Sequence, residues 1–349
     1  MTKTNPGNFF EDFRVGQRIR HATPRTLTAG DAALYTALTG SRFAVQSSDA
    51  FAQAVGYERA PLDDLLVFHT VFGKTVPDIS LNAVANLGYA DCVFGAPVWP
   101  GDSLSARSEV IGLRENANGK TGIVWVRTVG ENQRGARVLG YVRWVMVRKR
   151  NAGAPPPEPA VPDLPGAVAA GRLAAPAAFD PAGWDDELSG ETWRWGDYAP
   201  GEKIDHADGM TIEEAEHATA TRLYQNTAKV HFNQHTEGEG RFGRRLVYGG
   251  HIISMARALS FNGLANAFRI AAINGGRHVG PAFAGDTIYA WSEIVERIEL
   301  PGSPALGALR LRTVAAKDMP CAGFPDRDAD GRYPESVVLD LDYTVLIPR

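Results

Sequence analysis

The chain has 349 residues, of which 44% are hydrophobic and 22% charged, and its formal net charge is -4. This composition is typical of a soluble globular protein, the length favours two domains, and the negative charge excludes a general attraction to nucleic acid or anionic membranes. No segment approaches the roughly 20 apolar residues that a membrane span needs. Cys92 and Cys321 are too few for a disulfide framework or a cysteine zinc site, so a cytoplasmic location fits best.

The composition changes abruptly in the stretch "NAGAPPPEPAVPDLPGAVAAG" near the middle of the chain. Proline fixes extended conformers and lacks a backbone N–H, so such a stretch is typical of a linker. We therefore predict an N-terminal domain over residues 1–150, a linker over residues 151–190 and a C-terminal domain over residues 191–349.

The two flanks of this linker resemble each other. "EDFRVGQRIRH" matches "GDYAPGEKIDH", and "FGAPVWPGDSLSARSEV" matches "HVGPAFAGDTIYAWSEI". The matched residues, at offsets of 184 or 185, are Gly16 with Gly201, His21 with His206, Pro97 with Pro281, Gly101 with Gly285, and Asp102 with Asp286. Solenoid repeats run to about 50 residues at most, so this offset indicates a duplicated domain.

Each half has the same order of elements. Thr28 with Asp31, and Thr211 with Glu214, have the spacing of a capping box, so we predict a helix that begins at each threonine. A later run, "HIISMARALSFNGLA" at residues 251–265, has helical spacing. Its apolar face contains Ile252, Met255, Ala256 and Leu259.

Strand-like segments follow the helices in both halves. They are "GIVWVRTVG" and "ARVLGYVRWVMV" in the first half, and "DTIYAWSEIVERI", "GALRLRTVAA" and "SVVLDLDYTVLI" in the second. Several of them alternate apolar with polar residues, which indicates half-buried antiparallel strands. Helices followed by antiparallel strands predict an α+β fold.

The segments "YQNTAKVHFN" and "LVYGGHIISMARALS" resemble the MaoC-like, (R)-specific enoyl-CoA hydratase family. That family has an Asp, then Asn-Pro, an aliphatic residue and a His, with a His-Gly later at the head of the central helix. Here Asn226 takes the place of the Asp, Val230 is the aliphatic residue, His231 is the histidine, and Tyr248-Gly249 stands for the His-Gly. The resemblance covers nearly the whole chain, and within the family it is strongest to the mesaconyl-CoA hydratases, also called β-methylmalyl-CoA dehydratases.

The resemblance implies a double hotdog, in which each of two tandem units wraps an antiparallel sheet around a long helix. It implies reversible hydration of a short branched enoyl-CoA, with mesaconyl-CoA and water giving β-methylmalyl-CoA as the best match. Coenzyme A then belongs to the substrate, and neither a metal nor an organic cofactor is needed. By family analogy we expect a homodimer with no nucleic-acid or membrane partner.

The resemblance also assigns roles to residues. His231 would take a proton from water, and Gly249, at a predicted helix N-terminus, would offer its backbone N–H to the developing oxyanion. Asn226 would orient water, because an amide cannot shuttle a proton at neutral pH. Otherwise His235, Glu237 or Glu239 replaces the family's carboxylate. The residues expected to contact substrate are Lys229, Val230, Tyr248, Gly250 and Arg245, with Lys229, Arg244 and Arg245 as candidates for its carboxylate.

Three alternatives remain open at the level of the sequence. The first two are an (R)-specific hydratase for other enoyl-CoA substrates and a hotdog thioesterase. The third is a non-catalytic acyl-CoA-binding protein in which loss of the Asp has ended turnover. In the first half, Ser41 and Gln46 occupy the positions of Asn226 and His231, and neither titrates near neutral pH. We therefore expect one active site, in the second half, with the first half as scaffold and part of the acyl pocket.

The other histidines have no motif around them. His251 could face either the site or solvent. The histidines expected to be structural are His21, His69, His206, His217 and His278.

Overall fold

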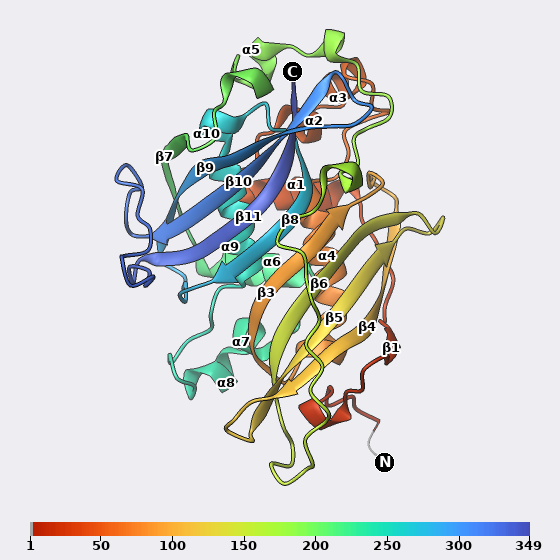
Figure 1. Ribbon diagram of the computed structural model, residues 1–349, viewed down its shortest axis with the longest axis vertical. Helices are drawn as coiled ribbons and strands as arrows, with labels where there is room; N and C mark the ends of the chain where they lie inside the picture. Colours follow the sequence, from red (N-terminus) through yellow and green to blue (C-terminus); the bar gives the residue numbers. More distant parts are fainter. Residues whose placement is uncertain (1–2) are drawn as a thin grey trace.

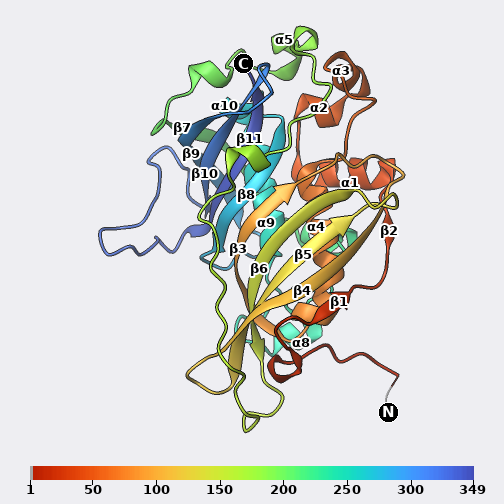
Figure 2. The same ribbon diagram turned by 45° about the vertical axis from the view of Figure 1, so that its right-hand side comes forward.

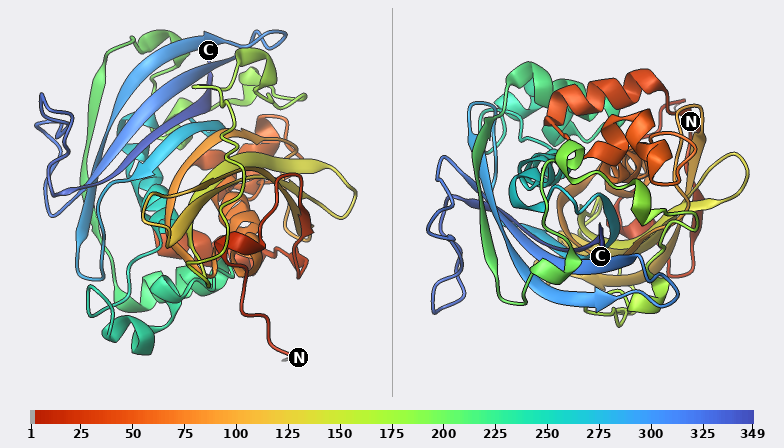
Figure 3. Two further views of the ribbon diagram at one scale, coloured as in Figure 1. Left: turned by 60° about the horizontal axis from the view of Figure 1, so that its bottom comes forward. Right: turned by 90° about the horizontal axis from the view of Figure 1, so that it is seen from above.

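The computed structural model describes residues 3–349. One continuous sheet of 11 strands curves around two central helices, α4 and α9 (Figures 1 and 2). All paired strands are antiparallel, in the order β1-β4-β5-β6-β3-β8-β11-β10-β9-β7, with β2 paired to β4. Seen from above, the remaining helices lie on the open side of this curved sheet (Figure 3).

From residue 3 onward, the first half contains six strands and four α-helices. Its strands are β1 (Arg18–Arg20), β2 (Arg25–Thr26), β3 (Ala83–Phe94), β4 (Ser103–Glu115), β5 (Thr121–Glu131) and β6 (Arg137–Arg148). Its helices are α1 (Ala29–Thr39), α2 (Ala44–Ser47), α3 (Asp49–Ala54) and α4 (Asp64–Thr75), with short helical turns η1 (Phe10–Asp12) and η2 (Val76–Ser80).

The linker and second half repeat this order. The strands are β7 (Lys203–Thr211), β8 (Arg269–His278), β9 (Thr287–Glu299), β10 (Leu306–Lys317) and β11 (Val337–Pro348). The helices are α5 (Asp186–Ser189), α6 (Glu214–Leu223), α7 (Lys229–Phe232), α8 (Gln234–Gly238), α9 (Gly249–Leu259) and α10 (Phe261–Leu264). Short turns are η3 (Ala170–Arg172), η4 (Pro181–Gly183) and η5 (Trp195–Asp197). Every segment predicted to be a strand is confirmed.

One of the two predicted helix starts is confirmed and the other is wrong. The hydroxyl of Thr28 accepts a hydrogen bond from the N–H of Asp31 at 3.2 Å, as a capping box requires. In the second half, Thr211 ends strand β7, where its partner in β9 is Thr287. Helix α6 begins only at Glu214, with Glu213 as its N-cap. Pairing within the sheet therefore takes precedence over the local capping signal.

The central helix of the second half is more deeply buried than its predicted apolar face requires. Every residue from Gly250 to Leu259 is buried, because the sheet covers one side of α9 and α1, α4 and α6 lie around the other. The predicted run to Ala265 is interrupted: Asn262 and Gly263 leave helical geometry, and Gly263 has φ 96°. The kink therefore lies within α10, just after the end of α9 at Leu259.

The repeat in the sequence becomes an approximate two-fold axis in the structure. The axis passes between β3 and β8, where Tyr89 pairs with Gly276 and Cys92 pairs with Ile273. An offset of 184 residues exchanges these two pairs, as a two-fold axis demands. Helices α4 and α9 meet at the equivalent residues His69 and Ser254, with 2.9 Å between the histidine Nε2 and the serine Oγ.

The same duplication repeats a buried polar cluster in each half. His21 Nε2 lies 2.8 Å from the Ser108 hydroxyl, which contacts Thr128. In the second half His206 and Ser292 make the same contact, also at 2.8 Å, and Ser292 contacts Thr313. Both clusters join neighbouring strands within the sheet.

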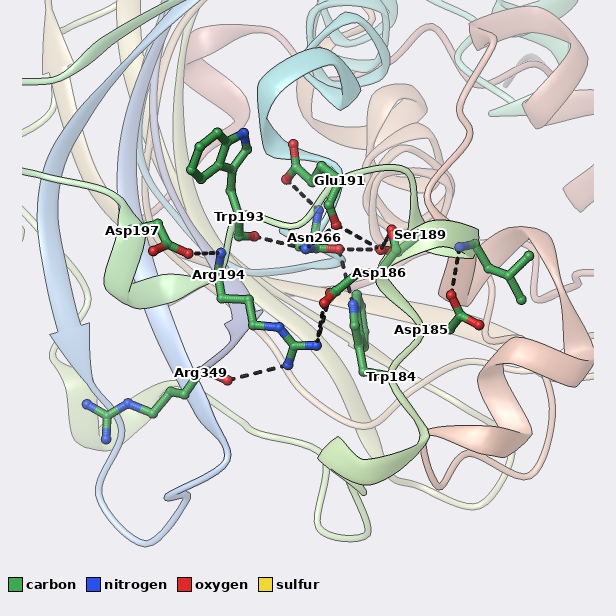
Figure 4. Close-up of polar contacts among 11 residues, drawn as sticks. Trp184, Asp185, Asp186, Ser189, Glu191, Trp193, Arg194, Asp197, Asn266 and Arg349 are labelled. Carbon is green, nitrogen blue, oxygen red and sulfur yellow. Dashed lines mark hydrogen bonds and ion pairs between the residues drawn. The ribbon is translucent and has the colours of Figure 1, made fainter.

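The segment predicted as a linker crosses between the halves with little regular structure, and its end is fixed by one buried amide (Figure 4). The side-chain nitrogen of Asn266 donates to the carbonyls of Glu191 and Trp193, and its oxygen accepts from Trp184 Nε1 and the Ser189 hydroxyl. Both donors and both acceptor positions of this amide are thus used. The division into two domains stays an interpretation of the repeat, because the sheet is continuous through both halves.

Candidate active site

A cavity of about 610 Å³ lies between the two halves. The first half contributes α4, the turn η2 and strands β3 and β6, and the second contributes the segment from Asn226 to Gly249 and the end of β8. A volume of several hundred Å³ suits a small-molecule ligand. Of the residues assigned roles from the sequence, those that line it are Asn226, Lys229, Val230, His231, Tyr248 and Gly249.

The chain enters the cavity through a turn that packs against α4. Gly73 permits this approach, because a Cβ there would lie 1.8 Å from the carbonyl oxygen of Tyr224. Gln225 then adopts a left-handed conformation, with φ 53°. Asn226, which is 1% exposed, follows and accepts a hydrogen bond from the N–H of Ala228 at 3.1 Å through its side-chain oxygen. That contact shows which side-chain atom of Asn226 is the oxygen. The amide nitrogen has no hydrogen-bond partner within residues 3–349.

His231 is held in one tautomer. Its Nδ1 lies 3.0 Å from the carbonyl oxygen of Leu246, so Nδ1 carries the proton and donates it. Leu246 in turn donates its N–H to the carbonyl of Val230 at 3.0 Å, which ties the short helix α7 to the strand-like entry of α9. Burial lowers the pKa of His231 to about 4, against the opposing effect of the Leu246 carbonyl. The ring is therefore neutral at pH 7, with the Nε2 lone pair available to the cavity.

The head of helix α9 supplies backbone donors. Tyr248 is its N-cap and makes no side-chain cap bond, and no protein acceptor within residues 3–349 meets the N–H groups of Gly249 and Gly250. The partial positive charge of a helix N-terminus adds to these donors. Gly250 lies beneath the cavity surface: a Cβ there would come within 2.4 Å of the Tyr248 ring and 2.6 Å of His69.

Tyr248 lies among aromatic rings. Its ring centroid is 5.5 Å from that of His231, and its hydroxyl lies 3.4 Å from Nδ1 of the buried His69. The Tyr248 ring is 4% exposed and forms one wall of the cavity beside His231.

A second histidine, predicted from the sequence to be structural, also lines the cavity. His278 is the last residue of β8, and its ring lies directly over Gly249, where a Cβ would be 2.5 Å from both Cε1 and Nδ1. Its Nε2 lies 3.2 Å from the hydroxyl of Tyr89. Burial, together with the nearby His231, lowers the pKa of His278 to about 4. The internal repeat distinguishes His278 in the sequence, because the equivalent position in the first half is a phenylalanine, Phe94.

The candidate replacements for the family's carboxylate are not equivalent. Glu237 is the one acidic residue within residues 3–349 that lines the cavity, whereas His235 and Glu239 are exposed outside it. No group of three or more His, Cys, Asp or Glu side chains within residues 3–349 is arranged to hold a metal ion.

The cations proposed for the substrate carboxylate lie mostly elsewhere. Arg245 forms an ion pair with Glu214 and does not line the cavity, so the structure does not support its predicted contact with substrate. Arg244 lies over the ring of Phe283 at 4.0 Å and is also absent from the lining. Lys229 does line the cavity, with an exposed side chain, together with the exposed residues Arg148 and Arg241.

The other histidines also have definite places. His251 is 1% exposed, faces neither the cavity nor solvent, and has no partner for its Nδ1. His217 is buried beside Glu214, at 3.4 Å between Nε2 and the carboxylate.

The equivalent pocket in the first half is almost closed, with a volume of about 10 Å³. It is lined by counterparts of the second-half site: Gln46 for His231, Asp64 for Gly249, Phe94 for His278 and Pro97 for Pro281. The Arg269 side chain also lines it and lies 3.8 Å from the carboxylate of Asp64.

Comparisons with known proteins agree with this architecture. A family profile described as mesaconyl-CoA hydratase matches residues 1–160. The chain is 67% identical to a β-methylmalyl-CoA dehydratase of Chloroflexus aurantiacus over 347 residues, which are 99% of both chains. A crystal structure described as a MaoC domain protein dehydratase from the same species superposes with a TM-score of 0.98 at 66% identity, covering 100% of this chain and 99% of the other.

A more distant structure confirms the predicted fold class. Rv0216 of Mycobacterium tuberculosis has a double hotdog fold and superposes with a TM-score of 0.75 at 25% identity, covering 99% of each chain. The predicted α+β double hotdog and the MaoC-like resemblance are therefore confirmed. No helix within residues 3–349 is both long and apolar enough to cross a membrane.

Proposed function

This chain belongs to the mesaconyl-CoA hydratase family, and on that premise we propose that it reversibly adds water to mesaconyl-CoA to give β-methylmalyl-CoA. The observation that carries the proposal is a neutral, tautomer-fixed imidazole facing the same cavity as an unpaired helix N-terminus. Hydration of an enoyl thioester needs a base for water and a donor for the thioester oxygen. His231 and the α9 terminus provide one of each.

In the proposed reaction, Nε2 of His231 removes a proton from water as the water oxygen bonds to Cβ of the alkene. The π electrons of the alkene move toward the thioester, and negative charge collects on its oxygen. The N–H group of Gly249, with the helix dipole, stabilises that enolate. The imidazolium of His231 then delivers the proton to Cα, so that a water molecule is added and His231 returns to its neutral form.

We assign supporting roles to the amide of Asn226 and the ring of His278. The free side-chain nitrogen of Asn226 donates to the water oxygen and so orients its lone pair, but it takes no proton. Burial raises the pKa of the Tyr89 phenol, which therefore stays protonated and can donate to His278 Nε2. In that tautomer His278 carries its proton on Nδ1, next to Gly249, where it adds a donor beside the thioester oxygen.

The exposed end of the cavity suits the nucleotide part of coenzyme A. Arg148, Lys229 and Arg241 line the cavity with exposed side chains and could meet the phosphates without leaving water. No step of this reaction requires a metal or an organic cofactor. We further propose that the protein is a cytoplasmic homodimer, and light scattering in solution would measure its oligomeric state.

The test follows the absorbance of the conjugated enoyl thioester as mesaconyl-CoA is hydrated. His231→Gln should lose about 100-fold or more in kcat, because general-base catalysis contributes at least that much. His235→Gln, an exposed histidine four residues away, is the matched control and should keep wild-type activity. Release of free CoA thiol would instead indicate a thioesterase. Binding of the thioester with no change in absorbance would indicate a protein that binds acyl-CoA without turnover.

A further inference from the structure

One arginine on the cavity wall lies inside the protein without a counter-ion. Arg143 is on β6, is 0% exposed and borders the cavity with Phe72, Ser80 and Tyr89. Among residues 3–349 no carboxylate lies within ion-pairing distance of its guanidinium. Of the two other buried arginines, Arg269 pairs with Asp64, and Arg257 donates to Ser260 and to the carbonyl of Ala267. A fully buried cation is costly unless it is paired.

The hydrogen bonds of Arg143 are also incomplete. Its Nη2 donates to the hydroxyls of Thr75 at 2.8 Å and Ser80 at 3.3 Å. Its Nε and Nη1, which carry three N–H groups between them, have no acceptor. The guanidinium lies over the Phe72 ring at 4.1 Å, which stabilises the charge but accepts none of these protons. The free donors therefore require an acceptor that the folded chain does not supply.

The position of Arg143 tells which part of a ligand it would meet. The cations with exposed side chains, Arg148, Lys229 and Arg241, occupy the part of the cavity that solvent reaches. Arg143 is buried against the C-terminal end of the core helix α4, where it contacts Phe72 and Thr75. A coenzyme A phosphate would stay with the exposed group, so the buried guanidinium faces the acyl end.

We propose that Arg143 binds the free carboxylate of a dicarboxylic acyl thioester and thereby determines the substrate class. This inference rests on the proposed function, in which the mesaconyl group carries a carboxylate on Cβ, the carbon that water attacks. A carboxylate offers two oxygens and one negative charge to a planar guanidinium fork. Fixing that carboxylate also fixes Cβ in front of His231, so one contact selects the substrate and sets the site of hydration.

The test compares two thioesters that differ in this carboxylate. Wild-type protein, Arg143→Met and Arg143→Lys are assayed with mesaconyl-CoA and with tiglyl-CoA, in which a methyl group replaces the carboxylate. Arg143→Met should lose about 100-fold or more in kcat/KM for mesaconyl-CoA, as expected when one partner of a buried charge pair is removed. Its kcat/KM for tiglyl-CoA should stay the same or rise, and Arg143→Lys should restore only part of the loss.

The matched control is Arg148→Met, which removes a cation from the exposed part of the same cavity. It should weaken both thioesters by a similar factor, because both carry coenzyme A. Equal losses for the two thioesters in Arg143→Met, in a protein with unchanged melting temperature, would overturn the proposal. So would retention of wild-type kcat/KM for mesaconyl-CoA.

A binding measurement separates this inference from the proposed reaction. Calorimetry with the saturated thioesters 2-methylsuccinyl-CoA and 2-methylbutyryl-CoA requires no turnover. Wild-type protein should bind the dicarboxylic thioester more tightly by about 30-fold or more, and Arg143→Met should remove that difference. If no enoyl thioester is hydrated but the dicarboxylic thioester still binds more tightly, the carboxylate site is supported and the hydratase function is refuted. If mesaconyl-CoA is hydrated but the two saturated thioesters bind equally well, the hydratase function is supported and the carboxylate site is refuted.

Discussion

Replacing Gly249 by alanine tests the head of helix α9 with the smallest possible change. A Cβ at this position would lie 2.5 Å from Cε1 and Nδ1 of His278, whereas ordinary contact begins near 3.4 Å. The His278 ring, which Tyr89 holds from its other side, would have to retreat by roughly 1 Å. A displacement of that size at a reacting centre costs about 100-fold in rate, or about 3 kcal/mol of transition-state stabilisation.

Alanine should leave the helix intact, because its helix propensity exceeds that of glycine by about 1 kcal/mol. We therefore expect Gly249→Ala to keep a melting temperature close to that of the wild type while kcat for thioester hydration falls about 100-fold. Gly323→Ala is the matched control, since a Cβ there meets no atom within 4 Å and its φ is not positive. It should change neither quantity.

A double-mutant cycle identifies the cause of the loss. If the new methyl group acts by displacing His278, then Gly249→Ala/His278→Ala should be no slower than His278→Ala alone. Additive losses would mean that the methyl group instead blocks access to the backbone donors. Wild-type kcat in Gly249→Ala, with the protein folded, would refute the placement of the thioester at this helix terminus.

Two further predictions concern charge inside the protein. Asn226→Asp should keep the contact with the Ala228 N–H but should replace the free amide donor by a carboxylate. It should therefore lower kcat/KM for mesaconyl-CoA about 10-fold and raise the pKa of His231, which a pH–rate profile would measure as an acid limb at higher pH; unchanged kinetics would contradict it. His251→Leu should make the protein less sensitive to acid. Burial lowers the pKa of His251 from 6.5 to about 4, so its contribution to stability is complete above pH 6.5 and is lost as the pH falls toward 4. The variant should avoid roughly 3 kcal/mol of that loss, which thermal unfolding at pH 7 and pH 5 would detect in part; parallel losses in both proteins would contradict it.

The architecture was predictable from local and repeated signals. Alternation in the strand segments and the offsets of 184 and 185 residues are properties of the sequence that folding preserves, and both halves show them. The second capping box failed because Thr211 can either cap a helix or pair in a sheet, and its pairing with Thr287 lies 76 residues away. A local motif holds no information about such a distant competitor.

The candidate site was predictable only where a motif identified it. His231 and Asn226 lie in one contiguous segment, but His278 and Arg143 approach the cavity from β8 and β6. The sequence contains two weaker signals. His278 corresponds to a phenylalanine, Phe94, in the other half of the repeat, and Arg143 lies on the same buried side of β6 as Tyr141 and Val145. An arginine on the buried side of a strand requires an explanation, because that residue is rarely buried unless paired.

The two pockets related by the approximate two-fold axis differ in whether their buried arginine is paired with a carboxylate of the chain. In the closed pocket of the first half, Arg269 lies 3.8 Å from Asp64 and donates to the carbonyl of Gly95 at 2.5 Å. Its equivalent in the open cavity is Ala85, and the equivalent of Asp64 is Gly249, which has no side chain. The closed pocket therefore supplies both the cation and its anion from the chain. In the open cavity the buried cation, Arg143, has no carboxylate of residues 3–349 within ion-pairing distance, and the small residues Ala85 and Gly249 at the equivalent positions leave room for a ligand to bring the anion.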